Sequence, residues 1–122
     1  MPNIVDHQTQ TNIGPTAYTM TETIATVYNI VVIVISCDLY NSGYTGPPCA
    51  DANNPPTDGT ITFTRVDRHF NDSEDWTQET FFAIFPTTGS KTITFTPAVH
   101  CPSCTWKTMV EQVQGIEADD QS

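Results

Sequence analysis

The sequence has few cations, no long apolar stretch and none of the common catalytic motifs. Its 122 residues include 4 Lys+Arg against 14 Asp+Glu, which gives a formal net charge of −10 at pH 7. Four cations do not make a surface that follows nucleic-acid phosphates, and they do not favour docking on anionic lipid. No stretch reaches the roughly 18–20 apolar residues of a membrane-spanning helix. We therefore expect no nucleic-acid partner and no membrane insertion.

The first residues also lack the basic segment and the apolar segment of a signal peptide. Four cysteines are nevertheless present, and an even number suits two disulfides, which persist in oxidising compartments. A virion protein satisfies both observations, because it is made in a cytoplasm and acts outside one. We therefore expect a virion or extracellular location.

Catalytic signatures are missing as well. The sequence contains no Gly-x-Ser-x-Gly elbow, no His-Glu-x-x-His helix and no phosphate-binding loop. Only His7, His69 and His100 suggest a general base. The neighbouring carboxylates Asp72 and Asp75 lie in a polar turn, without the apolar wall that adapts a carboxyl group for acid–base catalysis. We expect no enzymatic activity.

What the sequence does have is threonine, which occurs 21 times and alternates with apolar residues in several stretches. Such alternation predicts β-strands. Over residues 16–28 it places Tyr18, Met20 and Ile24 on one face, with Glu22 as an exception that we expect near an end or an interface. Residues 30–35 form a continuous β-branched run, which predicts a central strand buried on both faces.

Four more strands are predicted in the second half, over residues 60–66, 76–85, 91–96 and 105–113. Ile61 and Phe63 are expected to point inward, and the apolar run at 81–85 predicts a strand covered on both faces. Residues 86–90 read as a hairpin turn. The sequence Thr-Ile-Thr-Phe-Thr occurs at 60–64 and again at 92–96. A duplicated β-arch and the ordinary pattern of half-exposed strands both explain this repeat, and both predict a strand in each place.

Six or seven short strands separated by Gly/Pro-rich turns predict an all-β fold, a single β-sandwich of the immunoglobulin-like or jelly-roll-like kind. We expect residues 1–15 to form an extended polar N-terminal arm that lies against a neighbouring subunit. Residues 16–114 then form the sandwich, and residues 115–122 an acidic C-terminal tail. The long Gly/Pro-rich loop at about 41–58 is the expected place for binding.

The cysteines leave disulfides, reduced structural thiols and a metal site open. A Cys-x-x-Cys turn at 101–104 places two thiolates within reach of one zinc ion, with a histidine as a further ligand. A disulfide from Cys37 to Cys49 would instead close the long loop, and we expect this bond and no stoichiometric zinc. The disulfide candidates are Cys37, Cys49, Cys101 and Cys104, and the metal candidates are His69, His100, Cys101 and Cys104.

Two features suggest ligand binding in the long loop. Tyrosines flank it and would offer a stacking platform for a sugar, and its oxygen-rich side chains would suit calcium. The alternatives are core or subunit contacts for the tyrosines and solvated turns for the polar residues. The binding-loop candidates are Tyr40, Tyr44, Asp51, Asn53, Asn54 and Asp58.

These observations favour a non-enzymatic structural subunit of an extracellular assembly, with a head decoration, turret or fibre protein of a virus or phage as the leading example. Its partners would be subunits of the same assembly, so we expect a homo-oligomer. One alternative is a carbohydrate- or receptor-binding β-module. A second is a small zinc-binding protein. We expect no cofactor under the first hypothesis, while zinc or calcium would accompany the others.

Overall fold

The computed structural model describes residues 3–13, 16–38, 55–71, 76–96 and 105–115. Within them the chain forms seven strands and no helix, so no described helix could cross a membrane. The strands are β1 (Ile4–Ile13), β2 (Tyr18–Ile24), β3 (Ile30–Asp38), β4 (Thr64–Asn71), β5 (Trp76–Ile84), β6 (Gly89–Phe95) and β7 (Thr105–Val113). The predicted all-β fold is confirmed.

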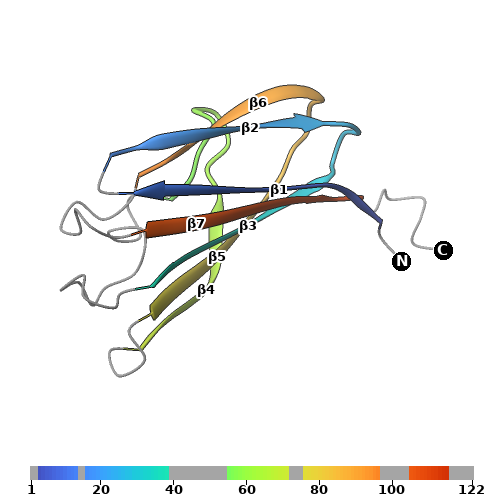
Figure 1. Ribbon diagram of the computed structural model, residues 1–122. Helices are drawn as coiled ribbons and strands as arrows, with labels where there is room; N and C mark the ends of the chain where they lie inside the picture. Colours follow the sequence, from blue (N-terminus) through green and yellow to red (C-terminus); the bar gives the residue numbers. More distant parts are fainter. Residues whose placement is uncertain (1–2, 14–15, 39–54, 72–75, 97–104, 116–122) are drawn as a thin grey trace.

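The strands form two antiparallel sheets that face each other in a sandwich-like arrangement (Figure 1). The large sheet has the order β1-β7-β3-β5-β4, and the small sheet consists of β2 and β6. The chain between β5 and β6 therefore passes from one sheet to the other. The predicted hairpin at 86–90 is wrong, because β6 pairs with β2 and β5 pairs with β3 and β4.

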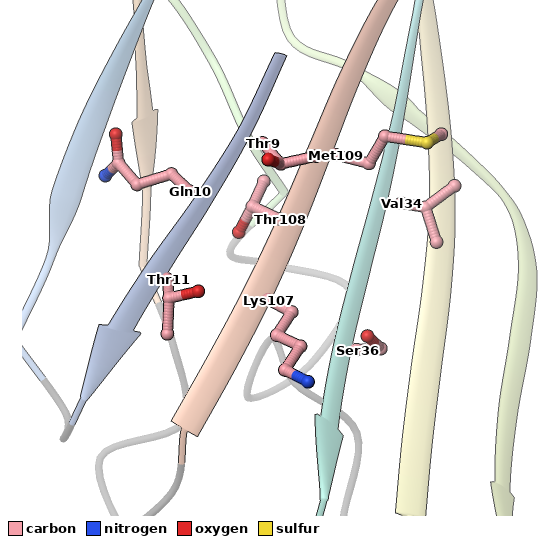
Figure 2. A pocket seen from close by; sticks show the side chains of 8 residues that line it. All are labelled: Thr9, Gln10, Thr11, Val34, Ser36, Lys107, Thr108 and Met109. Atoms are coloured by element: carbon pink, nitrogen blue, oxygen red, sulfur yellow. The ribbon is translucent and has the colours of Figure 1, made fainter. Parts of the chain in front are cut away.

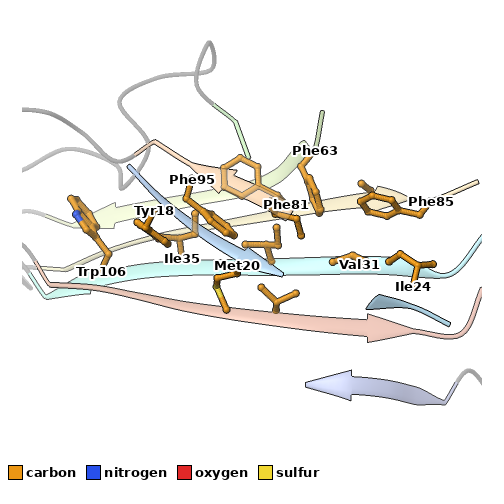
Figure 3. Close-up of a cluster of buried hydrophobic side chains, with 14 residues drawn as sticks. Tyr18, Met20, Ile24, Val31, Ile35, Phe63, Phe81, Phe85, Phe95 and Trp106 are labelled. Carbon is orange, nitrogen blue, oxygen red and sulfur yellow. The ribbon is translucent and has the colours of Figure 1, made fainter. Parts of the chain in front are cut away.

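The core lies between the two sheets and takes one face of each strand that contributes to it (Figure 3). The ring of Tyr18 on β2 stacks on that of Phe95 on β6, with centroids 4.9 Å apart. Alternation in β2, β6 and β7 was predicted from the sequence and is confirmed by the buried positions. The core residues are Tyr18, Met20, Ile24, Val31, Ile33, Ile35, Phe63, Phe81, Ala83, Phe85, Ile93, Phe95, Trp106 and Val110.

Strand β3 is the central strand of the large sheet, as predicted. Its inward residues Val31 and Ile33 are completely buried, whereas Val32 and Val34 on the opposite face are half-exposed. The neighbouring strand β5 behaves in the same way, with Phe81 buried and the adjacent Phe82 half-exposed. The prediction that both faces of these strands are buried is therefore wrong, because the small sheet covers only one face of the large one.

The first copy of the Thr-Ile-Thr-Phe-Thr repeat is mostly a turn and not a strand. Asp58 Oδ1 accepts hydrogen bonds from the backbone N–H groups of Thr60 (2.9 Å) and Ile61 (2.6 Å), and Gly59 has a positive φ of 96°. Strand β4 consequently begins only at Thr64, four residues later than predicted. The inward placement of Phe63 is confirmed, since it is buried, and Ile61 packs partly buried against the core.

Strand β1 consists of residues that the sequence suggests are part of an arm. It pairs with β7 of the same chain along most of its length, from Ile4 opposite Val113 to Ile13 opposite Thr105. An irregularity between Ile4 and Asp6 shifts the register by one residue. Strand β1 lies at the edge of the large sheet, and its half-buried positions are two glutamines and an asparagine. It therefore lacks the apolar alternation of the other strands.

The turn before β3, at Tyr28 and Asn29, lies directly against Gly115. The N–H of Tyr28 donates to Phe85 O at 2.7 Å, and Tyr28 has a positive φ of 67°. The N–H of Gly115 donates to Asn29 Oδ1 at 3.1 Å. A Cβ atom at position 115 would meet the Tyr28 carbonyl group, with its carbon 2.7 Å away. Glycine is therefore required at 115 by this close backbone approach.

Candidate functional site

A hollow lies on the outer face of the large sheet, which we define as the face turned away from β2 and β6. This surface depression spans β1, β7 and β3 and has a volume of about 340 Å³ (Figure 2). Its lining residues are Thr9, Gln10, Thr11, Val34, Ser36, Lys107, Thr108 and Met109.

Strand pairing places the outer side chains of the depression in two rows. Met109 pairs with Thr9 on one side and Val34 on the other, and Lys107 pairs with Thr11 and Ser36. Side chains directly opposite each other in antiparallel strands lie on the same face. The first row is largely apolar. The second row consists of two hydroxyl groups and an ammonium group, which can donate hydrogen bonds to an anionic or hydroxylated ligand.

Thr108 and Gln10 border the depression from the other side of the sheet. Thr108 is buried and shares a hydrogen bond of 2.5 Å with the hydroxyl group of Tyr18. Gln10 Nε2 donates to the Asn12 side-chain oxygen at 2.9 Å and to Thr19 O at 3.4 Å. Since these polar groups already have partners inside the protein, the outer row of Thr11, Lys107 and Ser36 is the part that is available to a ligand.

A histidine–glutamate pair lies farther along the same face. His7 Nδ1 on β1 and Glu111 Oε2 on β7 are 3.0 Å apart, and these two residues are directly paired across the strands. The side chains are 51% and 25% exposed. The pair is a surface contact between adjacent strands, and it lies two residues along β7 from Met109.

A second polar cluster is buried where the two sheets meet. Glu22 on β2 is only 1% exposed, and it accepts hydrogen bonds from Gln112 Nε2 on β7 (2.8 Å) and Gln8 Nε2 on β1 (2.6 Å). Burial raises the pKa of Glu22 above its ordinary value of 4.5, the two glutamines oppose this shift, and Asp6 adds to it. Glu22 lies two residues before the end of β2 and is buried between the two sheets, whereas the sequence suggested a position near an end or an interface.

The amide of Gln112 is the centre of this cluster. Its oxygen accepts from the N–H of Ala25 and from Asn29 Nδ2, both at 2.9 Å, and its nitrogen also donates to Thr23 O at 2.8 Å. Together with the bond to Glu22, these contacts use the full hydrogen-bonding capacity of the side chain. The cluster therefore stabilises the contact between the sheets and does not form a ligand site.

A third group of charged residues joins β4 and β5. The carboxylate of Glu79 is completely buried, and its Oε2 lies 3.7 Å from Arg65 Nη1 and 3.6 Å from Arg68 Nη2. Two of the four cations of the chain thus neutralise one buried acid. A buried charge without such partners is strongly destabilising, so these arginines have a structural role.

Most residues singled out from the sequence lie outside the described part of the chain. Cys37 lies in β3 at the register position between Thr77 and Trp106, but its side chain is outside the described part. His69 is exposed on β4, and Asp58 caps the turn before β4 through its hydrogen bonds. Within the described residues, no three His, Cys, Asp or Glu side chains form a group that could hold a metal ion. The candidates that lie outside the described residues are Tyr40, Tyr44, Cys49, Asp51, Asn53, Asn54, His100, Cys101 and Cys104.

The depression was not predicted from the sequence. Its residues come from strands that are far apart in the chain and become neighbours because β7 lies between β1 and β3. Lys107 and Met109 share a face because they alternate with the buried residues of β7. The sequence gives no signal for the pairing with Thr11 and Ser36, because that depends on strand order.

Comparisons of the chain with known protein families, with curated protein sequences and with solved structures found no match.

Proposed function

We propose that the chain is a non-enzymatic structural subunit of an extracellular assembly, and specifically a virion protein of a virus or phage, such as a head decoration, turret or fibre component. Its fold would then be an immunoglobulin-like or jelly-roll-like sandwich. Its partners would be subunits of the same assembly, including further copies of the chain.

The observation that carries this proposal is the outer face of the large sheet. Toward one end of β3 and β5 the outward residues are apolar although no described element covers them, as with Val32, Val34 and Phe82. An antiparallel sheet with one face in water normally alternates between apolar and polar residues. An apolar outer face is instead typical of a protein–protein contact.

The test is whether the chain belongs to a particle. Particles released by the producing cells are purified on a density gradient, washed with high salt and analysed by quantitative mass spectrometry. We expect the chain at a fixed molar ratio to the major particle protein, before and after the wash. A chain that is absent from the particles, or that the wash removes, would contradict the proposal.

The surface depression favours one alternative, a carbohydrate- or receptor-binding module. A volume of about 340 Å³ lies at the lower end of the range of ligand sites. Thr11, Ser36 and Lys107 would bind hydroxyl or carboxylate groups of a glycan, beside the apolar surface of Val34 and Met109. Binding on a glycan array that is lost in Lys107→Ala and retained in the control Lys91→Ala would favour this function over the first.

A further inference from the structure

We propose that the outer face of the large sheet packs against the same face of a second copy of the chain, which forms a two-fold symmetric dimer. This inference rests on the proposed function, because it names a second copy of the chain as one partner in the proposed assembly.

Most apolar residues of the outer face lie on the three central strands, with Ile4 and Ile13 on the edge strand β1 in addition. They follow from the pairing register, because residues opposite each other share a face. Ile84 is 49% exposed and projects at the β5 side of the face. Those on the central strands are Ile30, Val32 and Val34 on β3, Phe82 and Ile84 on β5, and Met109 and Val113 on β7.

The low charge of the outer face favours it as the surface through which two copies of the chain meet. By register, the ionised residues of the outer face are Lys107, Glu111, Asp67 and Asp38, which sum to −2, whereas the whole chain carries −10. Two copies with this charge repel each other, and the repulsion is smallest where the facing surfaces carry little charge. The outer face of the large sheet combines little charge with apolar contact area, whereas the outer face of the small sheet is uncharged but consists of threonines and a serine.

The face is also complementary to itself under a two-fold rotation. The two-fold axis lies between the two facing sheets and runs parallel to β3. Rotation about it places β5 of the second copy over β7 and β4 over β1, because these strands lie symmetrically about β3. Ile84 of the second copy then lies over Val113. Asp67 of the second copy comes over the row of Thr9 and Met109, next to the row of Lys107, so an ion pair forms twice in the dimer.

The size of the face is sufficient for such an interface. Five strands about 4.8 Å apart and about 30 Å long give roughly 600 Å² in projection, and the accessible area is larger. A stable interface buries about 800 Å² on each partner. Two sheets packed in this way would interdigitate their side chains at about 10 Å separation, as in the interior of a sandwich.

The experiment measures the dimer dissociation constant of the purified chain by analytical ultracentrifugation over a wide concentration range. We expect the wild type to dimerise and Val34→Glu to raise the dissociation constant at least tenfold. The matched control is Thr92→Glu, which adds the same charge on an exposed position of β6, on the opposite side of the sandwich. Far-UV circular dichroism and a thermal melt establish that each variant is folded.

A charge exchange gives a second measurement that does not depend on Val34. Lys107→Asp alone and Asp67→Lys alone should each weaken the dimer, and the double variant should restore it. A wild-type chain that stays monomeric at the highest concentration, or a dimer that all these variants leave unchanged, would overturn the inference. Neither outcome bears on particle association, because the density-gradient experiment measures that separately.

Discussion

The side-chain nitrogen of Gln112 donates a hydrogen bond of 2.8 Å to the buried carboxylate of Glu22, and this bond joins β7 of the large sheet to β2 of the small one. Both side chains are almost completely buried. The sandwich is therefore held together by an acid–amide contact as well as by its apolar core.

Glu22 should make the stability depend on pH. Because burial raises its pKa in the folded state, the folded protein binds this proton more tightly than the unfolded chain does. The contribution of Glu22 to the free energy of unfolding is therefore greatest below pH 4.5 and is lost as the pH rises through the raised pKa. In thermal melts, the melting temperature of Glu22→Gln minus that of the wild type should increase with pH over this window.

Asp6 provides the matched control for that measurement. It contributes to the raised pKa of Glu22 through a side-chain hydrogen bond and through charge repulsion, so Asp6→Asn should move the window to lower pH without abolishing it. A difference between Glu22→Gln and wild type that is constant from pH 4 to pH 8 would contradict the assignment of this dependence to Glu22.

The two faces of the large sheet should respond differently to truncation. Ile33 is completely buried, so Ile33→Ala should lower the free energy of unfolding by about 2–5 kcal/mol. Phe82 is half-exposed, so Phe82→Ala should cost clearly less in the monomer. Urea denaturation at low protein concentration measures both, and equal losses would show that the assignment of the faces is incorrect.

The N-terminal strand should contribute to the stability of the monomer. Gln8→Ala removes a donor from the buried carboxylate of Glu22, which should cost about 1–3 kcal/mol. Thr9→Ala, on the outer face of the same strand, is the control and should be nearly neutral. Deletion of residues 1–13 should lower the melting temperature strongly, whereas an arm bound only to a neighbouring subunit would leave the monomer melt unchanged.

Gly115 should not tolerate a side chain. A Cβ atom there meets the backbone carbonyl of Tyr28, which belongs to the turn before β3 and cannot move without disturbing its hydrogen bond to Phe85. We expect Gly115→Ala to cost about 1–3 kcal/mol, as overpacking does elsewhere. Gly59→Ala is an informative comparison, because its Cβ would meet nothing within 4 Å and only its positive φ opposes the change.

The cysteine chemistry stays a prediction. A disulfide between Cys37 and Cys49 would close a short loop and contribute about 3 kcal/mol in the chain-entropy model. Reduction should then lower the melting temperature of the wild type. In the double variant Cys37→Ser/Cys49→Ser, the part of this decrease that comes from the Cys37–Cys49 bond should be absent. Intact mass after alkylation counts the free thiols, and four alkylated cysteines with one zinc per chain would favour the metal-binding alternative.

Strands were predictable where alternation reports burial directly. In β2, Tyr18 and Met20 alternate with threonines, and the inward residues are buried as expected. The identical Thr-Ile-Thr-Phe-Thr sequences nevertheless differ, because Asp58 and Gly59 turn the chain before the first copy, while the second pairs with β2 over most of its length. Local turn chemistry outside the repeat therefore decides its conformation.

The sites were less predictable than the strands. Strand β1 has no apolar alternation, because Gln8 and Gln10 face inward and bond to β2 rather than to the apolar core. A polar strand of this kind resembles an unstructured arm in sequence. The depression depends on strand order, which local sequence patterns do not contain.

The position of β7 between β1 and β3 has a consequence for biosynthesis. Val113 pairs with Ile4 on one side and with Ile30 on the other, so the last of the described strands is the common partner of two earlier ones. Pairing over such long sequence separations slows folding, and an open edge of an apolar strand is prone to aggregate in the meantime. Strand β3 can pair with β5 once residue 84 has been translated, but its other edge stays open until residue 113 follows, which makes this edge the place where a chaperone would protect the nascent chain.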